Sequence, residues 1–122
     1  VSTVVGKLQD AMSPLRAFKF AFPPGSMTGA PKYRTTEIIH ELEGEHPREM
    51  YSGCAGFWSC RNKAFDANVI IRSVTFKDGV TKIGAGGAIT RLSDPNDEWD
   101  EVELKARRIV ETMAEIEAGE RI

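Results

Sequence analysis

Residues 51–85 read YSGCAGFWSCRNKAFDANVIIRSVTFKDGVTKIGA, and this stretch decides the fold class. It is rich in β-branched and aromatic residues, which favour strands. Polar turns divide it at residues 61–63 and at Asp78-Gly79, and Asp-Gly is a strong signal for a tight hairpin. Because the connections are short, we predict an antiparallel meander. Its three predicted strands are Tyr51–Cys60, Ala64–Phe76 and Val80–Ala85.

Helical patterns precede this stretch. Apolar residues near the start recur at helical spacing, so we predict a helix that is already running at residue 1. Ser13-Pro14 is typical of a cap followed by a first helical turn, although the phenylalanines within residues 18–22 also alternate as in a strand. A further helix is expected from about Pro31 to a stop at Gly44.

The last predicted helix has clear signals at both ends. Asp94 is a suitable N-cap, Pro95 suits the first helical position, and Gly119 suits the end. Its predicted core stripe comprises Trp99, Val102, Ala106, Ile109, Val110, Met113 and Ile116. Helices, then strands, then a helix predict an α+β fold, with helices packed outside the antiparallel meander.

The composition argues against several classes of function. The chain has 122 residues and a net charge of -2, which gives no reason to expect nucleic acid or an anionic membrane as the partner. No apolar run reaches membrane-spanning length. Cys54 and Cys60 lie about 20 Å apart along one predicted strand, too far for a disulfide. Free thiols without a signal-peptide pattern predict the cytoplasm.

One candidate for substrate binding is an arginine in the second predicted strand. Alternation places Arg72 on the same face as Asp66 and Asn68. A guanidinium there suits a bidentate grip on a substrate carboxylate. The alternative is a structural ion pair between Arg72 and Asp66.

The last helix carries a second candidate group. Glu98, Glu101 and Lys105 are spaced i, i+3 and i+7, so they share a stripe beside the apolar face. Two carboxylates one turn apart can hold Mg²⁺ directly or through water, and the lysine could meet the carboxylate of a bound anion. Taken alone, this spacing is more typical of a solvated helix face with a Glu–Lys ion pair.

Two glycine-containing loops could also meet an anion. Gly84, Gly86 and Gly87 could present backbone N–H groups, although such a stretch is more commonly a tight bend. The loop 24–32 leads into a helix N-terminus, where N–H groups and the helix dipole favour anions. It does not match a Walker phosphate loop, because Lys32 lacks the required neighbours.

Taken in order, these motifs resemble the signature of chorismate-binding enzymes over nearly the whole chain. This family includes aminodeoxychorismate synthase component I, anthranilate synthase component I, and the isochorismate and salicylate synthases. The motifs that carry the resemblance are PGSMTGAPKYR (24–34), EIIHELE (37–43), YSG (51–53), Asp66, IIR (70–72), GAGGAI (84–89), SDP (93–95) and EWDEVELKA (98–106). One departure is Ala88, where relatives usually have glycine.

The resemblance implies roles for particular residues. Glu98 and Glu101 would lie at a Mg²⁺ site, with Glu101 as the direct ligand. Chorismate would be contacted by Ser26, Tyr51, Arg72, Gly86, Gly87 and Lys105. Among these, Arg72 and Tyr51 would hold the enolpyruvyl carboxylate, helped by backbone N–H groups of the glycines.

The resemblance also implies a larger enzyme with the family's layered α+β fold. Residues 1–122 would form the C-terminal portion of a single chorismate-binding domain. The general acid, the catalytic lysine and one Mg²⁺-binding glutamate would lie upstream, so we expect this chain alone to be inactive and to leave apolar surface uncovered.

The motif wording favours one member of the family. The sequence is more similar to aminodeoxychorismate synthase than to anthranilate synthase at two motifs, Gly25-Ser26-x-Thr28-Gly29 and Gly86-Gly87. Anthranilate synthase remains an alternative, as do the isochorismate and salicylate synthases. The implied ammonia source is a glutamine amidotransferase subunit. An alternative from another class is a non-catalytic module that keeps the fold, against which the joint presence of Arg72, Glu98, Glu101 and Lys105 argues.

Overall fold

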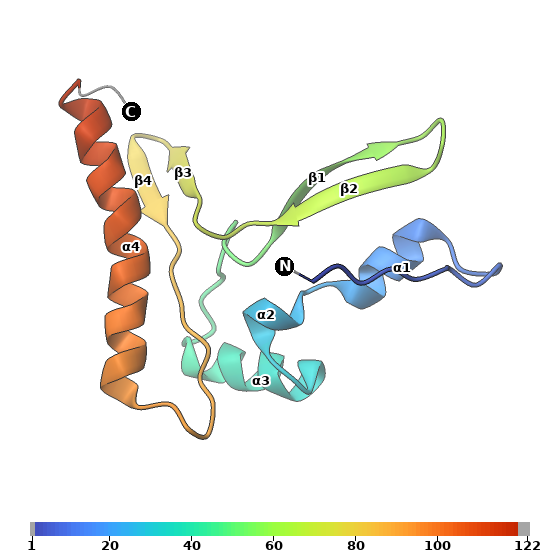
Figure 1. Ribbon diagram of the computed structural model, residues 1–122, viewed down its shortest axis with the longest axis horizontal. Coiled ribbons are helices and arrows are strands. Elements are labelled where there is room, and N and C mark those ends of the chain that lie inside the picture. The colour runs from blue at the N-terminus through green and yellow to red at the C-terminus, as the bar shows by residue number, and fades with distance from the viewer. Residues whose placement is uncertain (1, 120–122) are drawn as a thin grey trace.

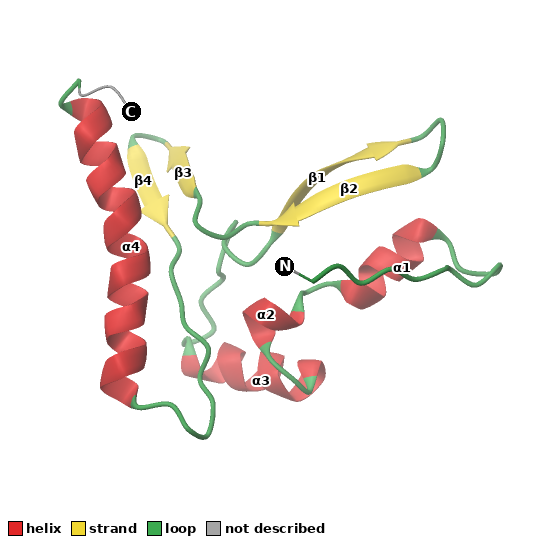
Figure 2. Ribbon diagram, in the orientation of Figure 1, coloured by secondary structure: helices red, strands yellow, loops and turns green. Residues whose placement is uncertain are grey.

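The computed structural model describes residues 2–119. Within this range the chain forms four helices and four strands, which confirms the predicted α+β class (Figures 1 and 2). The elements in chain order are α1 (Pro14–Ala21), α2 (Gly25–Thr28), α3 (Lys32–Leu42), β1 (Cys54–Ser59), β2 (Ala64–Val69), β3 (Val74–Lys77), β4 (Val80–Ile83) and α4 (Pro95–Glu117).

The helix predicted at the start of the chain is wrong for the residues described. Residues 2–12 form no helix, and residue 1, where that prediction began, lies outside the described range. The side chain of Val4 is 96% exposed, so the apolar pattern has no surface to pack against. An isolated helix of this length is marginal in water, because tertiary packing supplies most helical stability.

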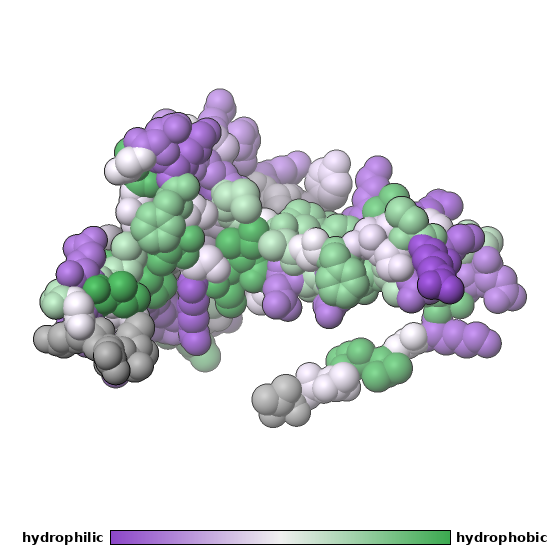
Figure 3. Space-filling model, turned by 90° about the horizontal axis from the view of Figure 1, so that it is seen from above, coloured by the Kyte–Doolittle hydropathy of each residue, from purple (hydrophilic) through white to green (hydrophobic). Residues whose placement is uncertain are grey.

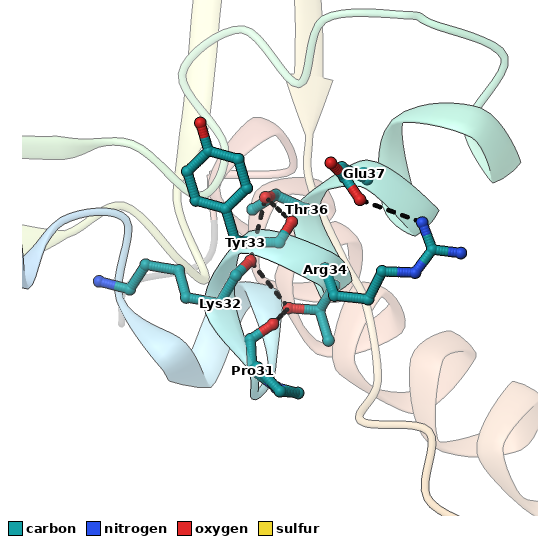
Figure 4. A network of polar contacts seen from close by, with 7 residues as sticks. Pro31, Lys32, Tyr33, Arg34, Thr36 and Glu37 are labelled. Atoms are coloured by element: carbon teal, nitrogen blue, oxygen red, sulfur yellow. Dashed lines mark hydrogen bonds and ion pairs between the residues drawn. The ribbon is translucent and has the colours of Figure 1, made fainter.

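The two helices predicted next are confirmed. Ser13 caps α1, its hydroxyl accepting from the backbone N–H of Arg16, and Pro14 occupies the first turn. α3 follows Pro31 and ends before Gly44, whose φ of 64° suits a glycine. In the first turns of α3, Thr36 donates to the carbonyls of the residues three and four positions back, and Arg34 pairs with Glu37 at 3.0 Å (Figure 4).

The loop before α3 has a structural role that the sequence did not predict. It contains the short helix α2 and leads into Lys32, the first residue of α3, whose ammonium is already hydrogen-bonded within the chain. The ammonium of Lys32 donates to the carbonyls of Phe20 and Ala21, at 3.1 and 2.9 Å. Lys32 therefore caps the C-terminal end of α1, where carbonyls lack helical partners and the helix dipole favours a cation.

Both predicted antiparallel pairings form, but the second predicted strand is not continuous, so the part of the chain that the structure describes contains two separate hairpins. β1 pairs with β2 and β3 pairs with β4, both antiparallel. The second predicted strand breaks between Val69 and Val74, where Arg72 has a φ of 49°. The predicted turn at Asp78-Gly79 is confirmed, with φ of 51° and 75°.

Aromatic contacts connect the first hairpin to α1. Phe65 on β2 stacks on its cross-strand neighbour Trp58, with ring centroids 5.5 Å apart, and meets Phe18 of α1 edge-on at 5.3 Å. Such contacts stabilise the arrangement by about 1 kcal/mol each beyond the buried area. Cys54 and Cys60 are free, as predicted, and both are exposed.

The last helix is confirmed, but its apolar stripe is not a buried core. Asp94 caps α4 by accepting from the N–H groups of Asn96 and Asp97, and Gly119 follows its end. Yet no hydrophobic side chain within residues 2–119 is buried, and Trp99 on the predicted stripe is 62% exposed. Hydrophobic side chains are visible across the middle of one face (Figure 3). The expected uncovered apolar surface is therefore present, and it leaves the predicted outer packing of helices incomplete in this chain.

Candidate functional site

A cavity of about 380 Å³ gathers the residues that the sequence selected for substrate binding. Five separate segments contribute to it: α2, the turn before β1, the link between β2 and β3, the loop after β4, and α4. The lining residues are Ser26, Met27, Glu43, Arg48, Tyr51, Ile71, Arg72, Gly84, Ala85, Gly86, Gly87, Ala88, Lys105 and Ile109. All six predicted substrate-contacting residues are among them.

Tyr51 is held against the glycine loop. A methyl group built on Gly84 would lie 2.3 Å from two carbons of the Tyr51 ring, and one on Gly86 would lie 2.8 Å from its hydroxyl. The N–H of the next residue, Ser52, donates at 3.0 Å to the carbonyl of Ile70, which directly follows β2. The glycines thus make room for the tyrosine, which is a more specific role than the tight bend considered from sequence.

Arg72 reaches the cavity by a route that alternation did not predict. It lies in the link between the two hairpins, outside any strand, so its positive φ rather than strand alternation sets its direction. Within residues 2–119 its guanidinium has neither an ion pair nor a hydrogen bond, and the alternative pair with Asp66 does not form. An arginine in a cavity without a partner of its own is suited to binding an anion.

Lys105 joins α4 to the glycine loop at the edge of the cavity. Its ammonium donates to the carbonyl of Gly86 at 3.2 Å and forms an ion pair with Glu101 at 2.8 Å. The Glu–Lys pair considered from spacing therefore exists, but it lies at the cavity rather than on a fully solvated face, because Lys105 lines the cavity and is only partly exposed.

Glu98 presents a carboxylate oxygen that has no partner among residues 2–119. Its Oε1 accepts a hydrogen bond from the hydroxyl of Ser93, whereas its Oε2 is buried and forms no hydrogen bond within this range. A methyl group built on Gly87 would lie 3.2 Å from this Oε2. A buried carboxylate oxygen normally has a donor or a cation, because leaving it unpaired costs about 1–3 kcal/mol or more.

These carboxylates fit part of a Mg²⁺ site. Oxygen ligands suit Mg²⁺, which usually retains waters and needs one or two carboxylates. Within the part of the chain that the structure describes, no group of three or more His, Cys, Asp or Glu side chains could hold a metal. The structure adds a distinction between the two glutamates, because Glu101 is paired with Lys105 and the unpartnered oxygen belongs to Glu98.

Sequence reasoning missed two charged residues in the cavity wall. Glu43 and Arg48 form a two-pronged ion pair across the turn that follows α3. The hydrogen bond from Arg48 holds the pKa of Glu43 below its ordinary value, and the hydrogen bond to Glu43 raises the pKa of Arg48. Opposite charges flanking a glycine-containing turn were the available signal.

Comparisons with known proteins agree on one family. Residues 1–111 match the family model described as chorismate binding enzyme. The chain is 50% identical over 115 residues to a probable aminodeoxychorismate synthase, chloroplastic, of Oryza sativa, covering 94% of this chain. It is 46% identical to an aminodeoxychorismate synthase of Streptomyces griseus, over 93% of the chain, and 39% identical to an anthranilate synthase component 1 of Saccharomyces cerevisiae, over 96%.

The chain is much shorter than these three relatives. It spans only 13%, 15% and 23% of their lengths, respectively. Among the residues described, none of the helices is both long enough and apolar enough to cross a membrane.

Proposed function

Because the chain belongs to the family of chorismate binding enzymes, we propose that it contributes the substrate cavity of an aminodeoxychorismate synthase, which converts chorismate and ammonia to 4-amino-4-deoxychorismate. The observation that carries the proposal is the cavity between α2 and α4, because residues from five distant segments meet there.

The charges around the cavity suit a dianionic substrate. Arg72 has no partner among the described residues, so it can hold the enolpyruvyl carboxylate of chorismate by two parallel hydrogen bonds. The hydroxyl of Tyr51, which lies beside Gly86, would donate to the same carboxylate. Lys105 provides a second positive charge at the other wall. These groups would position the ring and stabilise charge rather than exchange protons.

We propose that Glu98 and Glu101 contribute ligands to a Mg²⁺ ion beside this cavity. The buried, unpartnered Oε2 of Glu98 supports this assignment, since a cation would satisfy it. When bound, Mg²⁺ would neutralise the ring carboxylate of chorismate and favour loss of the 4-hydroxyl group. Lys105 would then keep Glu101 oriented through their 2.8 Å ion pair.

We further propose that residues 1–122 form the C-terminal portion of one chorismate-binding domain in a larger enzyme, here called the parent enzyme. Two observations support this: the chain spans a small part of its relatives, and it has no buried hydrophobic side chain among residues 2–119. The general acid and the catalytic lysine would come from the remainder. We therefore expect the 122-residue chain alone to leave chorismate unchanged.

The parent enzyme would obtain ammonia from a glutamine amidotransferase subunit. We propose a cytoplasmic location for it, although two plant relatives have the word chloroplastic in their names. The preference for 4-amino-4-deoxychorismate over anthranilate rests on the aminodeoxychorismate synthases among its relatives, which are 40–50% identical, against 34–39% for the anthranilate synthases.

The experiment is to incubate the parent enzyme with chorismate, Mg²⁺ and ammonium, and to identify the product by mass and absorbance. Formation of 4-amino-4-deoxychorismate supports the proposal. Formation of anthranilate or isochorismate would leave the family assignment and the substrate cavity in place but would reject the proposed reaction. If neither the wild type nor Glu101→Ala converts chorismate, the chain belongs to a non-catalytic module.

A further inference from the structure

Arg48 makes more contacts than any role in binding substrate requires. Its guanidinium donates to both carboxylate oxygens of Glu43, at 2.8 Å from Nε and 2.5 Å from Nη2. Its Nη1 donates to the carbonyl of Met27 in α2 at 2.9 Å and approaches the hydroxyl of Ser52 at 3.4 Å. One side chain thus connects the end of α3, the helix α2 and the turn that leads into β1.

These contacts leave Arg48 little capacity to bind an anion. An arginine has five N–H donors, and four of those of Arg48 are directed at groups of the protein. Its charge is balanced by Glu43, and the mutual pKa shifts of the two groups have the directions expected of such a pair. The two arginines of the cavity therefore differ, because Arg72 lacks such partners within residues 2–119.

The groups that Arg48 holds are neighbours of the proposed substrate contacts. Met27 follows Ser26, and Ser52 follows Tyr51. Ser52 is 8% exposed and is the most enclosed residue within the described range. The guanidinium also lies 6.0 Å from the centre of the Tyr51 ring, a distance at which a cation and an aromatic ring attract.

We infer that Arg48 is a positioning residue, which sets the spacing between Tyr51 and Ser26 across the cavity and does not itself bind chorismate. The inference rests on the proposed function, because it assigns those two residues to the substrate. Lysine cannot replace Arg48, since a single ammonium cannot reach both oxygens of Glu43 and the carbonyl of Met27 with the same geometry.

The test is steady-state kinetics of the parent enzyme carrying Arg48→Lys. We expect kcat/KM for chorismate to fall about tenfold to hundredfold, the loss typical when a group that orients a ligand residue is removed. Arg107→Lys is the matched control, because Arg107 forms an exposed ion pair with Glu103 at 3.9 Å, away from the cavity. This control should leave kcat/KM within twofold of wild type.

A double-mutant comparison of kcat/KM for Arg48 and Tyr51 distinguishes a positioning role from a general loss of stability. If Arg48 acts through Tyr51, then Arg48→Lys should cost clearly less in a Tyr51→Phe background than in wild type. Equal losses in the two backgrounds would overturn the inference, as would wild-type kinetics for Arg48→Lys in an enzyme that turns over chorismate. A wild-type enzyme without activity would instead reject the proposed function.

A second variant covers the case in which Arg48→Lys does not fold. Glu43→Gln leaves Arg48 in place but removes the charge that holds it. By circular dichroism this variant should be folded, and its KM for chorismate should rise severalfold. A folded Glu43→Gln enzyme with wild-type KM and kcat would overturn the inference.

Discussion

Replacing Gly84 by alanine should lower the turnover of chorismate without changing any charged residue of the cavity. The added methyl group would lie 2.3 Å from two carbons of the Tyr51 ring and 2.6 Å from its Cβ. Carbon atoms in contact are separated by about 3.5–4.0 Å, so the ring or the loop must move by about 1 Å or more. A misplacement of about 1 Å at a reacting site can cost about a hundredfold in rate, which corresponds to about 2.7 kcal/mol.

The assay is kcat/KM of the parent enzyme for chorismate, together with its melting temperature. Gly6→Ala is the matched control, because a methyl group at Gly6 meets no atom of residues 2–119 within 4 Å, and it should behave as wild type. A Gly84→Ala enzyme that retains kcat/KM within threefold of wild type would contradict this prediction. An equal loss of kcat/KM in Gly6→Ala and Gly84→Ala would contradict it as well.

Three further predictions concern single side chains. Glu98→Gln should raise the Mg²⁺ concentration needed for half-maximal activity by at least about tenfold, because it removes the charge of the carboxylate whose Oε2 has no hydrogen bond among the described residues. An unchanged Mg²⁺ titration would contradict this. The lowered pKa of Glu43 implies that its pair with Arg48 contributes fully to stability above pH 4.5 and that this contribution is lost as the pH falls through the lowered value. The difference in melting temperature between wild type and Glu43→Gln should accordingly shrink on acidification, and a difference that grows would reject the pairing. Lys32→Met should reduce the free energy of unfolding by about 1 kcal/mol in urea titrations, because two carbonyls at the end of α1 lose their donor; no loss would mean that Lys32 is not a cap.

Local signals in the sequence predicted the boundaries of three helices and the two turns. Ser13 and Asp94 cap their helices as predicted, because a cap depends on groups within three residues of it. Asp78-Gly79 forms the predicted turn for the same reason, since both residues tolerate positive φ. Short-range hydrogen bonds and backbone preferences decide these features, and both can be read from sequence.

Features that depend on distant partners were not predicted. The apolar run through Ile70 and Ile71 concealed the break between β2 and β3, because β-branched residues favour strands whether or not a partner strand is present. The helix expected to be running already at residue 1 is absent from residues 2–12 for the converse reason, since its apolar pattern has no surface to cover there.

The sequence predicted which residues belong to the candidate site, but not how the backbone brings them together. The family motifs selected Tyr51 and Arg72, and both line the cavity, yet strand alternation gave the wrong account of how Arg72 reaches it. Arg48 and Glu43 were missed, because the available signal was two opposite charges that flank a glycine-containing turn, and such a pair has no fixed spacing. The contact between Tyr51 and Gly84 joins residues 33 positions apart, and no local pattern predicts it.

The most direct test of the central claim is a calorimetric titration of the parent enzyme with chorismate, with and without Mg²⁺, for wild type, Arg72→Ala and Glu98→Gln. We predict that wild type binds chorismate and that Mg²⁺ strengthens this binding. Arg72→Ala should lose at least about tenfold in affinity, the cost of a charge-assisted pair. Glu98→Gln should lose the effect of Mg²⁺. Equal affinities for all three proteins, with no effect of Mg²⁺, would contradict this prediction, because chorismate would then bind away from the cavity described.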